Sequence, residues 1–222
     1  MKYLIHAVPT RLHYVEGYLI PSMLQQGIPL SHIDVYVDSY HEGNLKSTLK
    51  SFSQLPDKGE TCHLQDDVIL ARDFKKHIEE YHDLVEVGPE PIAMCCFESI
   101  YDKGETKDKE WVKPKDMWYS FQCIVIPNKI AHEFVDWVQQ KEDDEDGKYW
   151  LQITNNMFDD YLFKSFLTEK HPGADVYLQN PNLVDHIDYI IGGSTLSKRD
   201  CPMRTFSFKD QDLVEKLEKT YR

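Results

Sequence analysis

The sequence predicts an α/β protein, a single domain with a mostly parallel central sheet flanked by helices. Within the first 65 residues, short apolar segments alternate with segments in which apolar residues recur at helical spacing. Parallel strands need crossover connections, usually helices, and this alternation is typical of them. The 222 residues are 41% hydrophobic and 28% charged, which is ordinary for a globular chain and excludes a wholly disordered one.

The first part of the chain supports this class element by element. Residues 2–8 form an apolar segment that stops at Pro9, which predicts a buried first strand. Apolar residues at Leu12, Val15 and Leu19 predict a helix over residues 12–24. The next expected elements are a strand at 33–37, a helix at 47–55 and a strand at 61–64.

The second part has a less regular pattern, and several of its segments are expected to be loops. Helices are expected at 73–82, 128–140, 158–167 and 211–221, and strands at 84–87, 92–97, 122–126 and 175–178. Residues 101–115 are highly charged without a period, which predicts a surface loop; 142–146 reads as an acidic linker and 194–202 as a tail. We expect residues 1–208 to form one domain and 209–222 a C-terminal helix.

Charge and cysteine content narrow the classes of function. With 25 basic against 38 acidic residues, the net charge of -13 repels phosphate and excludes a broad electrostatic surface for nucleic acid. No apolar run approaches the roughly 20 residues that span a bilayer, so no membrane partner is expected. The first apolar stretch is too short for a signal peptide, and the five cysteines have no C-x-x-C spacing. A cytoplasmic protein with reduced thiols is therefore expected.

The most informative motif is the carboxylate pair Asp66-Asp67, directly after the apolar strand at 61–64. Strand ends of an open α/β sheet face the ligand crevice, where two adjacent carboxylates repel each other. A divalent cation such as Mg²⁺ or Mn²⁺ removes that conflict. The alternative is that one of the two residues simply caps a turn.

Two further motifs carry groups for catalysis or metal binding. Asp159-Asp160 opens a predicted helix, where the pair is either a cap that complements the helix dipole or a source of a general base. His186 follows an apolar pair and sits at a predicted strand end. If it meets Asp67, it becomes a further metal ligand and favours Mn²⁺ over Mg²⁺; a structural histidine is the alternative.

The order of these segments resembles that of the GT-A glycosyltransferases, nucleotide-sugar-dependent enzymes with one Rossmann-like domain. The resemblance covers residues 2–208. Residues 7–11 (Ala-Val-Pro-Thr-Arg) are similar to the family's first strand end, which implies that Pro9 and Arg11 contact the nucleotide. Residues 35–38 (Val-Tyr-Val-Asp) resemble the segment whose acid recognises the uracil or ribose, which implies the same role for Asp38.

The motif at residues 65–67 occupies the place of the family's D-x-D motif. The resemblance implies that Asp67 binds the metal and that Asp66 faces the ribose or sugar hydroxyls. Gln65 stands where the family usually has an acid, so the nucleotide contact at that position carries one charge less. Residues 181–186 (Pro-Asn-Leu-Val-Asp-His) resemble the family's Pro-x-Leu-Val-x-His stretch, which implies that His186 shares the metal with Asp67.

The resemblance also implies the remaining parts of an active site. Inverting members carry an acidic pair before a helix, and the second acid is the base, which points to Asp160. The acceptor side is assigned to Trp118, Tyr119 and Asp159. Ser194 and Arg204 are assigned to the nucleotide-sugar, in a lid over 194–204 that also holds Lys198 and Arg199 as counter-charges.

The expected function is thus a metal-dependent, inverting glycosyltransferase that moves a sugar from a UDP-sugar to an acceptor hydroxyl, with Mn²⁺ or Mg²⁺ as cofactor. One alternative is a phage-type enzyme that glycosylates hydroxymethylated bases in DNA, using a basic cleft in the lid. Another is a non-catalytic nucleotide-sugar-binding module of the same fold, an alternative based on Gln65.

Overall fold

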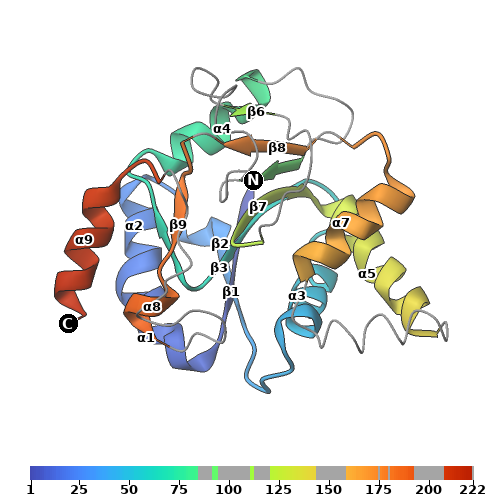
Figure 1. Ribbon diagram of the computed structural model, residues 1–222, viewed down its shortest axis with the longest axis horizontal. Helices are drawn as coiled ribbons and strands as arrows, with labels where there is room; N and C mark the ends of the chain where they lie inside the picture. The colour runs from blue at the N-terminus through green and yellow to red at the C-terminus, as the bar shows by residue number, and fades with distance from the viewer. Residues whose placement is uncertain are drawn as a thin grey trace.

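The computed structural model describes residues 1–84, 92–94, 111–112, 121–143, 159–174, 176–179, 181–192 and 208–221. Within these ranges the chain forms a central sheet with helices packed on both faces (Figure 1). The expected α/β class is confirmed.

The central sheet has seven strands in the order β2-β1-β3-β7-β5-β8-β6. Their bounds are β1 (Lys2–Ala7), β2 (Ile33–Val37), β3 (Glu60–Gln65), β5 (Ile92–Met94), β6 (Trp111–Val112), β7 (Cys123–Pro127) and β8 (Val176–Gln179). β1 pairs in parallel with β2 and β3, and β5 with β8, whereas β7 and β6 run antiparallel to their neighbours. Five of the seven strands in the described sheet therefore point the same way, and the expected mostly parallel sheet is confirmed.

A second, two-stranded sheet branches from the carboxyl end of β3. β4 (Val68–Leu70) pairs antiparallel with β9 (Val184–His186), and the register places Val68 opposite His186. This pairing joins residues more than 100 positions apart and holds the turn after β3 in place.

The helices form two layers, one on each side of the sheet (Figure 1). A nearly continuous helix made of α1 (Leu12–Tyr14), a π-helical turn η2 (Val15–Leu19) and α2 (Ile20–Gln25) lies on one side with α4 (Phe74–Leu84), α8 (Asp188–Ile191) and α9 (Gln211–Thr220). The other side carries α3 (Asn44–Ser53), α5 (Asn128–Asp143) and α7 (Asp159–Lys170). Two short 3₁₀ turns, η1 (Pro9–Arg11) and η3 (Leu30–His32), complete the described helical segments.

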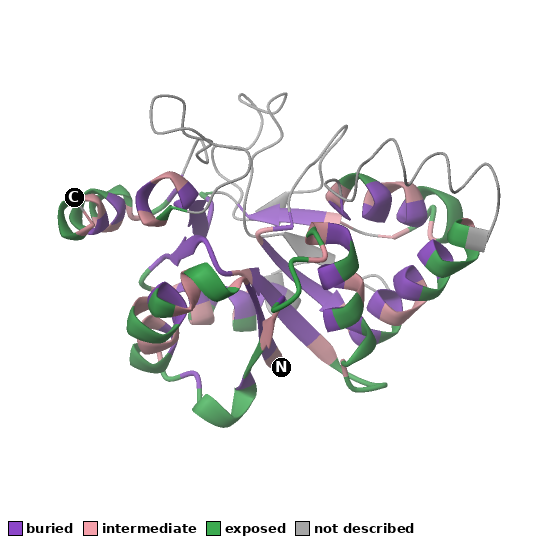
Figure 2. Cartoon of the chain, turned by 90° about the horizontal axis from the view of Figure 1, so that it is seen from below, coloured by how far each residue is buried: buried purple, intermediate pink, exposed green. Residues whose placement is uncertain are grey.

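Two hydrophobic cores fill the space between these layers and the sheet. Successive side chains of a strand point to opposite faces, so β7 sends Cys123 and Val125 into one core and Ile124 and Ile126 into the other. Figure 2 shows the same division, with buried strands in the middle and helices that are buried on their inner faces and exposed outside. None of the described helices has the length and apolar composition needed to cross a bilayer.

The structure corrects three expectations about local structure. Trp111–Val112 forms the edge strand β6, within the segment expected to be a charged loop, because it pairs with β8 through backbone hydrogen bonds. Leu84 ends α4 instead of starting a strand at 84–87, and residues 85–87 lie outside the described ranges. Glu142 and Asp143 continue α5 into the expected acidic linker. The tail expected at 194–202 falls outside the description.

Candidate functional site

The turn between β3 and β4 presents Asp66 and Asp67 at the carboxyl end of the parallel strands. Both are buried, with only 2% and 6% of their surface exposed. The backbone N–H of Val8, just after β1, donates to Oδ2 of Asp66 at 2.6 Å, and Ile187 N–H donates to the carbonyl of Asp67 at 2.8 Å. The carboxylate pair is thus fixed between the ends of β1 and β9.

Arg11 reaches back over this turn from the 3₁₀ turn η1. Pro9 stops β1 and begins η1, which reverses the chain direction. The Arg11 guanidinium then contacts both acids: Nε lies 3.2 Å from Oδ1 of Asp66, and Nη1 pairs with Oδ2 of Asp67. Only 13% of the Arg11 side chain is exposed, so this is a largely buried ion pair.

His186 completes the cluster from the end of β9. Its Nε2 lies 3.2 Å from Oδ2 of Asp67, and its Nδ1 lies 3.5 Å from Oδ1 of Asp188, the first residue of α8. The expected meeting of Asp67 and His186, which are far apart in the sequence, is present in the structure because β4 pairs with β9. Their role as metal ligands stays a prediction.

Asp66 and Asp67 have pKa values shifted in opposite directions. Burial, together with the charge of Asp67, raises the pKa of Asp66 to about 7, although Arg11 acts against this shift. Burial alone would raise the pKa of Asp67 as well, but His186 and Arg11 outweigh it and hold the pKa well below its usual range. Asp67 is therefore the more acidic member of the pair.

This cluster offers a carboxylate oxygen and an imidazole nitrogen that fit a hard divalent cation. Oδ1 of Asp67 is buried and makes no hydrogen bond within the described part of the chain. A carboxylate oxygen beside an imidazole nitrogen suits Mn²⁺ or Mg²⁺. Among the described residues, no group of three or more His, Cys, Asp or Glu side chains is placed to hold a metal ion by itself. A cation here would take further ligands from its substrate or from solvent.

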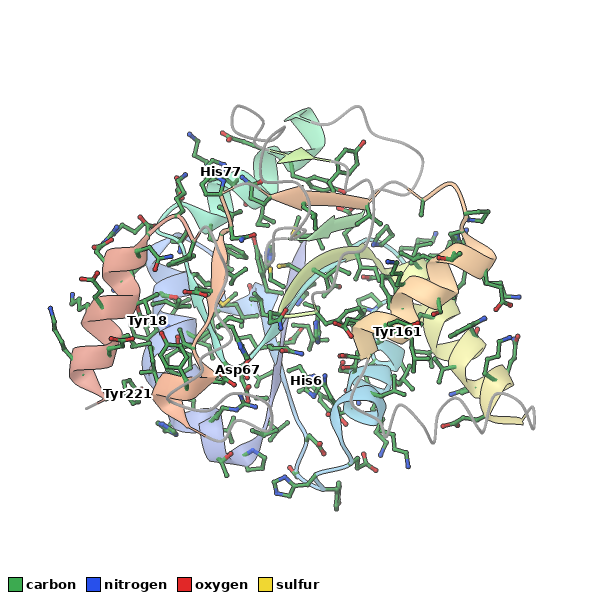
Figure 3. All side chains as sticks on the ribbon, in the orientation of Figure 1. His6, Tyr18, Asp67, His77, Tyr161 and Tyr221 are labelled. Carbon is green, nitrogen blue, oxygen red and sulfur yellow. The ribbon has the colours of Figure 1, made fainter. Side chains whose placement is uncertain are left out.

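His6 and Asp38 lie beside this cluster at the carboxyl ends of β1 and β2. The Asp38 N–H donates to the carbonyl of Ala7 at 2.8 Å, and Oδ1 of Asp38 accepts from Glu42 N–H at 3.1 Å. Figure 3 shows His6 and Asp67 near one another at this end of the sheet. Burial lowers the pKa of His6 to about 4, although Asp38 and Asp67 act against it, so the imidazole is neutral at pH 7.

The second acidic pair, Asp159 and Asp160, starts α7. Thr48 Oγ1 of α3 donates to Oδ2 of Asp159 at 3.1 Å, and the N–H of Asp160 donates to Oδ1 of Asp159 at 3.0 Å. Burial and the neighbouring Asp160 raise the pKa of Asp159 to about 7. Asp160 is half-buried, accepts from Tyr161 N–H at 2.7 Å, and has a pKa raised by burial.

Helix α3 contacts His6 and Asp159 through two neighbouring hydroxyl groups. Ser47 Oγ lies 2.5 Å from Nε2 of His6, and Thr48 bonds Asp159. Sequence reasoning missed these residues. A single histidine in an apolar strand and a serine and threonine in a helix carry no pattern that separates them from core and surface residues. Only their burial in the fold marks them.

No family model and no curated protein matches the sequence, but solved structures match the fold. A glycosyltransferase involved in the glycosylation of the major capsid of PBCV-1 has a TM-score of 0.52 at 9% identity, covering 100% of this chain and 98% of that one. The galactosyltransferase LgtC, in complex with donor and acceptor sugar analogs, has a TM-score of 0.47 at 12% identity and 96% coverage of its chain. Residues 1–349 of TarS from S. aureus have a TM-score of 0.49 at 10% identity, and this chain spans 62% of them.

The chain has a GT-A-like glycosyltransferase fold. Within that fold, Arg11, Asp66, Asp67 and His186 form one contacting cluster. The nucleotide and metal roles assigned to them stay predictions. Asp159 and Asp160 form a separate pair, with hydrogen bonds to Thr48 of α3 and to backbone N–H groups of α7.

The other predicted site residues divide into two groups. Pro9 is exposed in η1, and Gln65 is the half-buried last residue of β3, in register with His6 of β1. The roles assigned to them stay predictions. The remaining site residues lie outside the described ranges: Trp118, Tyr119, Ser194, Lys198, Arg199 and Arg204.

Proposed function

We propose that this protein is a glycosyltransferase that takes a sugar from a UDP-sugar and transfers it, with inversion, to an acceptor hydroxyl. One observation carries the proposal: Arg11, Asp66, Asp67 and His186 converge at the carboxyl ends of β1 and β3 in a GT-A-like fold. This is the edge of an open α/β sheet at which ligands bind. The PBCV-1 protein, a glycosyltransferase with a similar fold, supports the same class.

We propose Asp67 and His186 as the residues that hold a divalent cation, Mn²⁺ or Mg²⁺. Support comes from their 3.2 Å separation and from the unbonded Oδ1 of Asp67. A cation bound there would balance the negative charge that a nucleoside diphosphate gains as it leaves the sugar. Asp188, near the other nitrogen of His186, would orient the imidazole with Nε2 toward the site.

The chain's own residues supply the other steps of the proposal. Asp160 would accept the proton of the acceptor hydroxyl, because burial gives it a pKa closer to neutrality than that of a free aspartate. Asp38, fixed at the end of β2, would bind the ribose or base. We also place the protein in the cytoplasm, in keeping with the buried thiols of Cys62 and Cys123, whose sulfur atoms lie 3.8 Å apart without forming a disulfide.

A thermal-unfolding assay tests this proposal directly. UDP with Mn²⁺ at about 100-fold over its dissociation constant should stabilise the protein by about 2.7 kcal/mol. UDP in the presence of a chelator should give a much smaller shift, and ADP should serve as the matched nucleotide control. Incubation with a panel of UDP-sugars should then release UDP by slow hydrolysis or transfer. No stabilisation by UDP under any metal condition would contradict the proposal.

The same release assay separates the proposal from its two rivals. A non-catalytic binding module would be stabilised by UDP but would release none from any UDP-sugar. An enzyme acting on modified DNA would transfer to a hydroxymethylated duplex with an activity that falls steeply as salt rises.

A further inference from the structure

We propose that Arg11 is an internal counter-ion that competes with the divalent cation for Asp67, so that cation binding depends on a diphosphate that draws Arg11 away. This inference rests on the proposed function and adds to it an order of binding. It is based on the observation that the Arg11 guanidinium contacts the carboxylates of both Asp66 and Asp67.

The competition follows from the atoms involved. Oδ2 of Asp67 is the oxygen that faces His186 Nε2 at 3.2 Å, and it is also the oxygen that Arg11 Nη1 contacts. A cation shared by Asp67 and His186 would therefore lie against the guanidinium. An arginine side chain does not lose its proton in proteins, so this repulsion cannot be relieved by deprotonation.

Arg11 is held in this place by more than one contact. Its Nε lies 3.2 Å from Oδ1 of Asp66, whose other oxygen accepts the Val8 N–H at 2.6 Å. Because 13% of the side chain is exposed, the pair is shielded from solvent and from salt. The positive charge of Arg11 thus offsets the negative charge of Asp66 and Asp67 before a divalent cation binds.

A nucleoside diphosphate gives Arg11 a second partner. Guanidinium groups bind phosphate through paired hydrogen bonds, and a diphosphate brings more charge than a single carboxylate. Once Arg11 turns to the diphosphate, its positive charge no longer opposes a cation at Asp67 and His186. By linkage, if the diphosphate strengthens cation binding by some factor, the cation strengthens diphosphate binding by the same factor. Couplings of this kind are typically about 5- to 150-fold.

The test is a titration with Mn²⁺ alone and with Mn²⁺ plus saturating UDP, following free Mn²⁺ by electron paramagnetic resonance. In the wild type, Mn²⁺ alone should bind weakly, and UDP should tighten binding at least about 10-fold. In Arg11→Gln, Mn²⁺ alone should bind about 10-fold more tightly than to the wild type, and UDP should add less than about 3-fold. Arg11→Lys keeps the competing charge and should bind Mn²⁺ alone as weakly as the wild type does.

Arg72→Gln is the matched control, because Arg72 also pairs with two aspartates, Asp210 and Asp212, but on the exposed surface near α9. It should leave both titrations unchanged. If Arg11→Gln binds Mn²⁺ alone no more tightly than the wild type does, the proposal is overturned, while UDP-dependent stabilisation would leave the proposed function standing.

The wild-type titration keeps the proposal falsifiable even if Arg11→Gln does not fold. An Mn²⁺ affinity that UDP does not change in the wild type overturns it. If neither the wild type nor any of these variants binds Mn²⁺ while all of them bind UDP, both the metal assignment and this inference are wrong.

Discussion

The two Asp-Asp pairs of this protein have the same sequence, yet the pKa values of their second acids are shifted in opposite directions. Asp66 and Asp159 are alike, since each is buried, each lies beside a second acid, and each has a pKa raised to about 7. Their partners differ. The pKa of Asp67 is lowered by His186 and Arg11, whereas that of Asp160 is raised by burial.

The difference lies in the cations around each pair. Arg11 and His186 reach Asp67 from η1 and β9, and they keep it ionised. Asp160 has the N–H of Tyr161 as a partner and a helix N-terminus around it, which is a weaker source of positive charge. The first pair is therefore suited to hold a charge against a ligand, and the second to gain and lose a proton. Sequence identity between the pairs predicts neither role.

The largest effect should come from Asp67→Asn, which removes the more acidic carboxylate of the first pair. We expect transfer to fall about 10⁴-fold, because a bound cation contributes several kcal/mol of charge stabilisation. Stabilisation by UDP should also lose its Mn²⁺ dependence. Asp210→Asn, at the exposed pair with Arg72, is the control and should leave both readouts intact. An active Asp67→Asn variant would mean that the cluster around Arg11 does not serve the reaction.

Asp160→Asn should have the next largest effect. Loss of a general base lowers rates by about 10²- to 10⁴-fold, and we expect a value near 10³. Unlike Asp67→Asn, this variant should keep Mn²⁺-dependent stabilisation by UDP, because among the described residues the Asp160 carboxylate bonds Tyr161 N–H and not the first cluster. Nucleotide release and thermal shift, measured on the same protein, separate the two pairs. Loss of UDP binding in Asp160→Asn would show that they act as one site.

Because the pKa of Asp159 is raised, we expect the difference in folding stability between Asp159→Asn and the wild type to grow with pH. Its folded pKa of about 7 lies above the value of 3.8 for an exposed aspartate, so the folded state holds its proton longer than the unfolded state does. The wild type should lose stability from this group as pH rises from about 4 to about 7. Asp159→Asn cannot ionise, so its stability relative to the wild type should rise over that window by about 4 kcal/mol.

Urea denaturation at pH 4.5, 6 and 8 measures this difference. His6 and His63, whose pKa values burial lowers to about 4 and about 3, destabilise both proteins on acidification and so cancel in the comparison. A difference between wild type and Asp159→Asn that does not change with pH would mean that Asp159 is ionised throughout.

Elements with strong local periodicity could be predicted from the sequence, and elements that depend on distant pairing could not. The strands β1, β2 and β3 are short segments rich in apolar or β-forming residues and bounded by turn residues, so local sequence predicts them. β4 and β6 are too short for a period and exist because β9 and β8 pair with them. Long-range contacts of this kind leave no local signal.

The same distinction applies to the site. Asp67 lies just beyond β3 and His186 ends β9, and their meeting was expected from the resemblance to the GT-A enzymes. The contact of Arg11 with both acids could not be predicted, because it depends on the tight 3₁₀ turn after Pro9. Ser47 and Thr48 gave no signal, since small hydroxyl residues in a helix usually face solvent, whereas here both are fully buried against β1 and α7.

The smallest predicted effect tests the contact between Thr48 and Asp159. Thr48→Val keeps the shape of the side chain and removes the hydroxyl that donates to Oδ2 of Asp159 at 3.1 Å. We expect a loss of about 1 kcal/mol at pH 8, where the hydrogen bond stabilises a charged oxygen, and a smaller loss at pH 5. Ser51→Ala is the control, because Ser51 is a buried α3 hydroxyl that donates to the Thr48 carbonyl at 2.8 Å. Its cost should not depend on pH; an equal cost for Thr48→Val at both pH values would show that the hydroxyl does not sense the charge of Asp159.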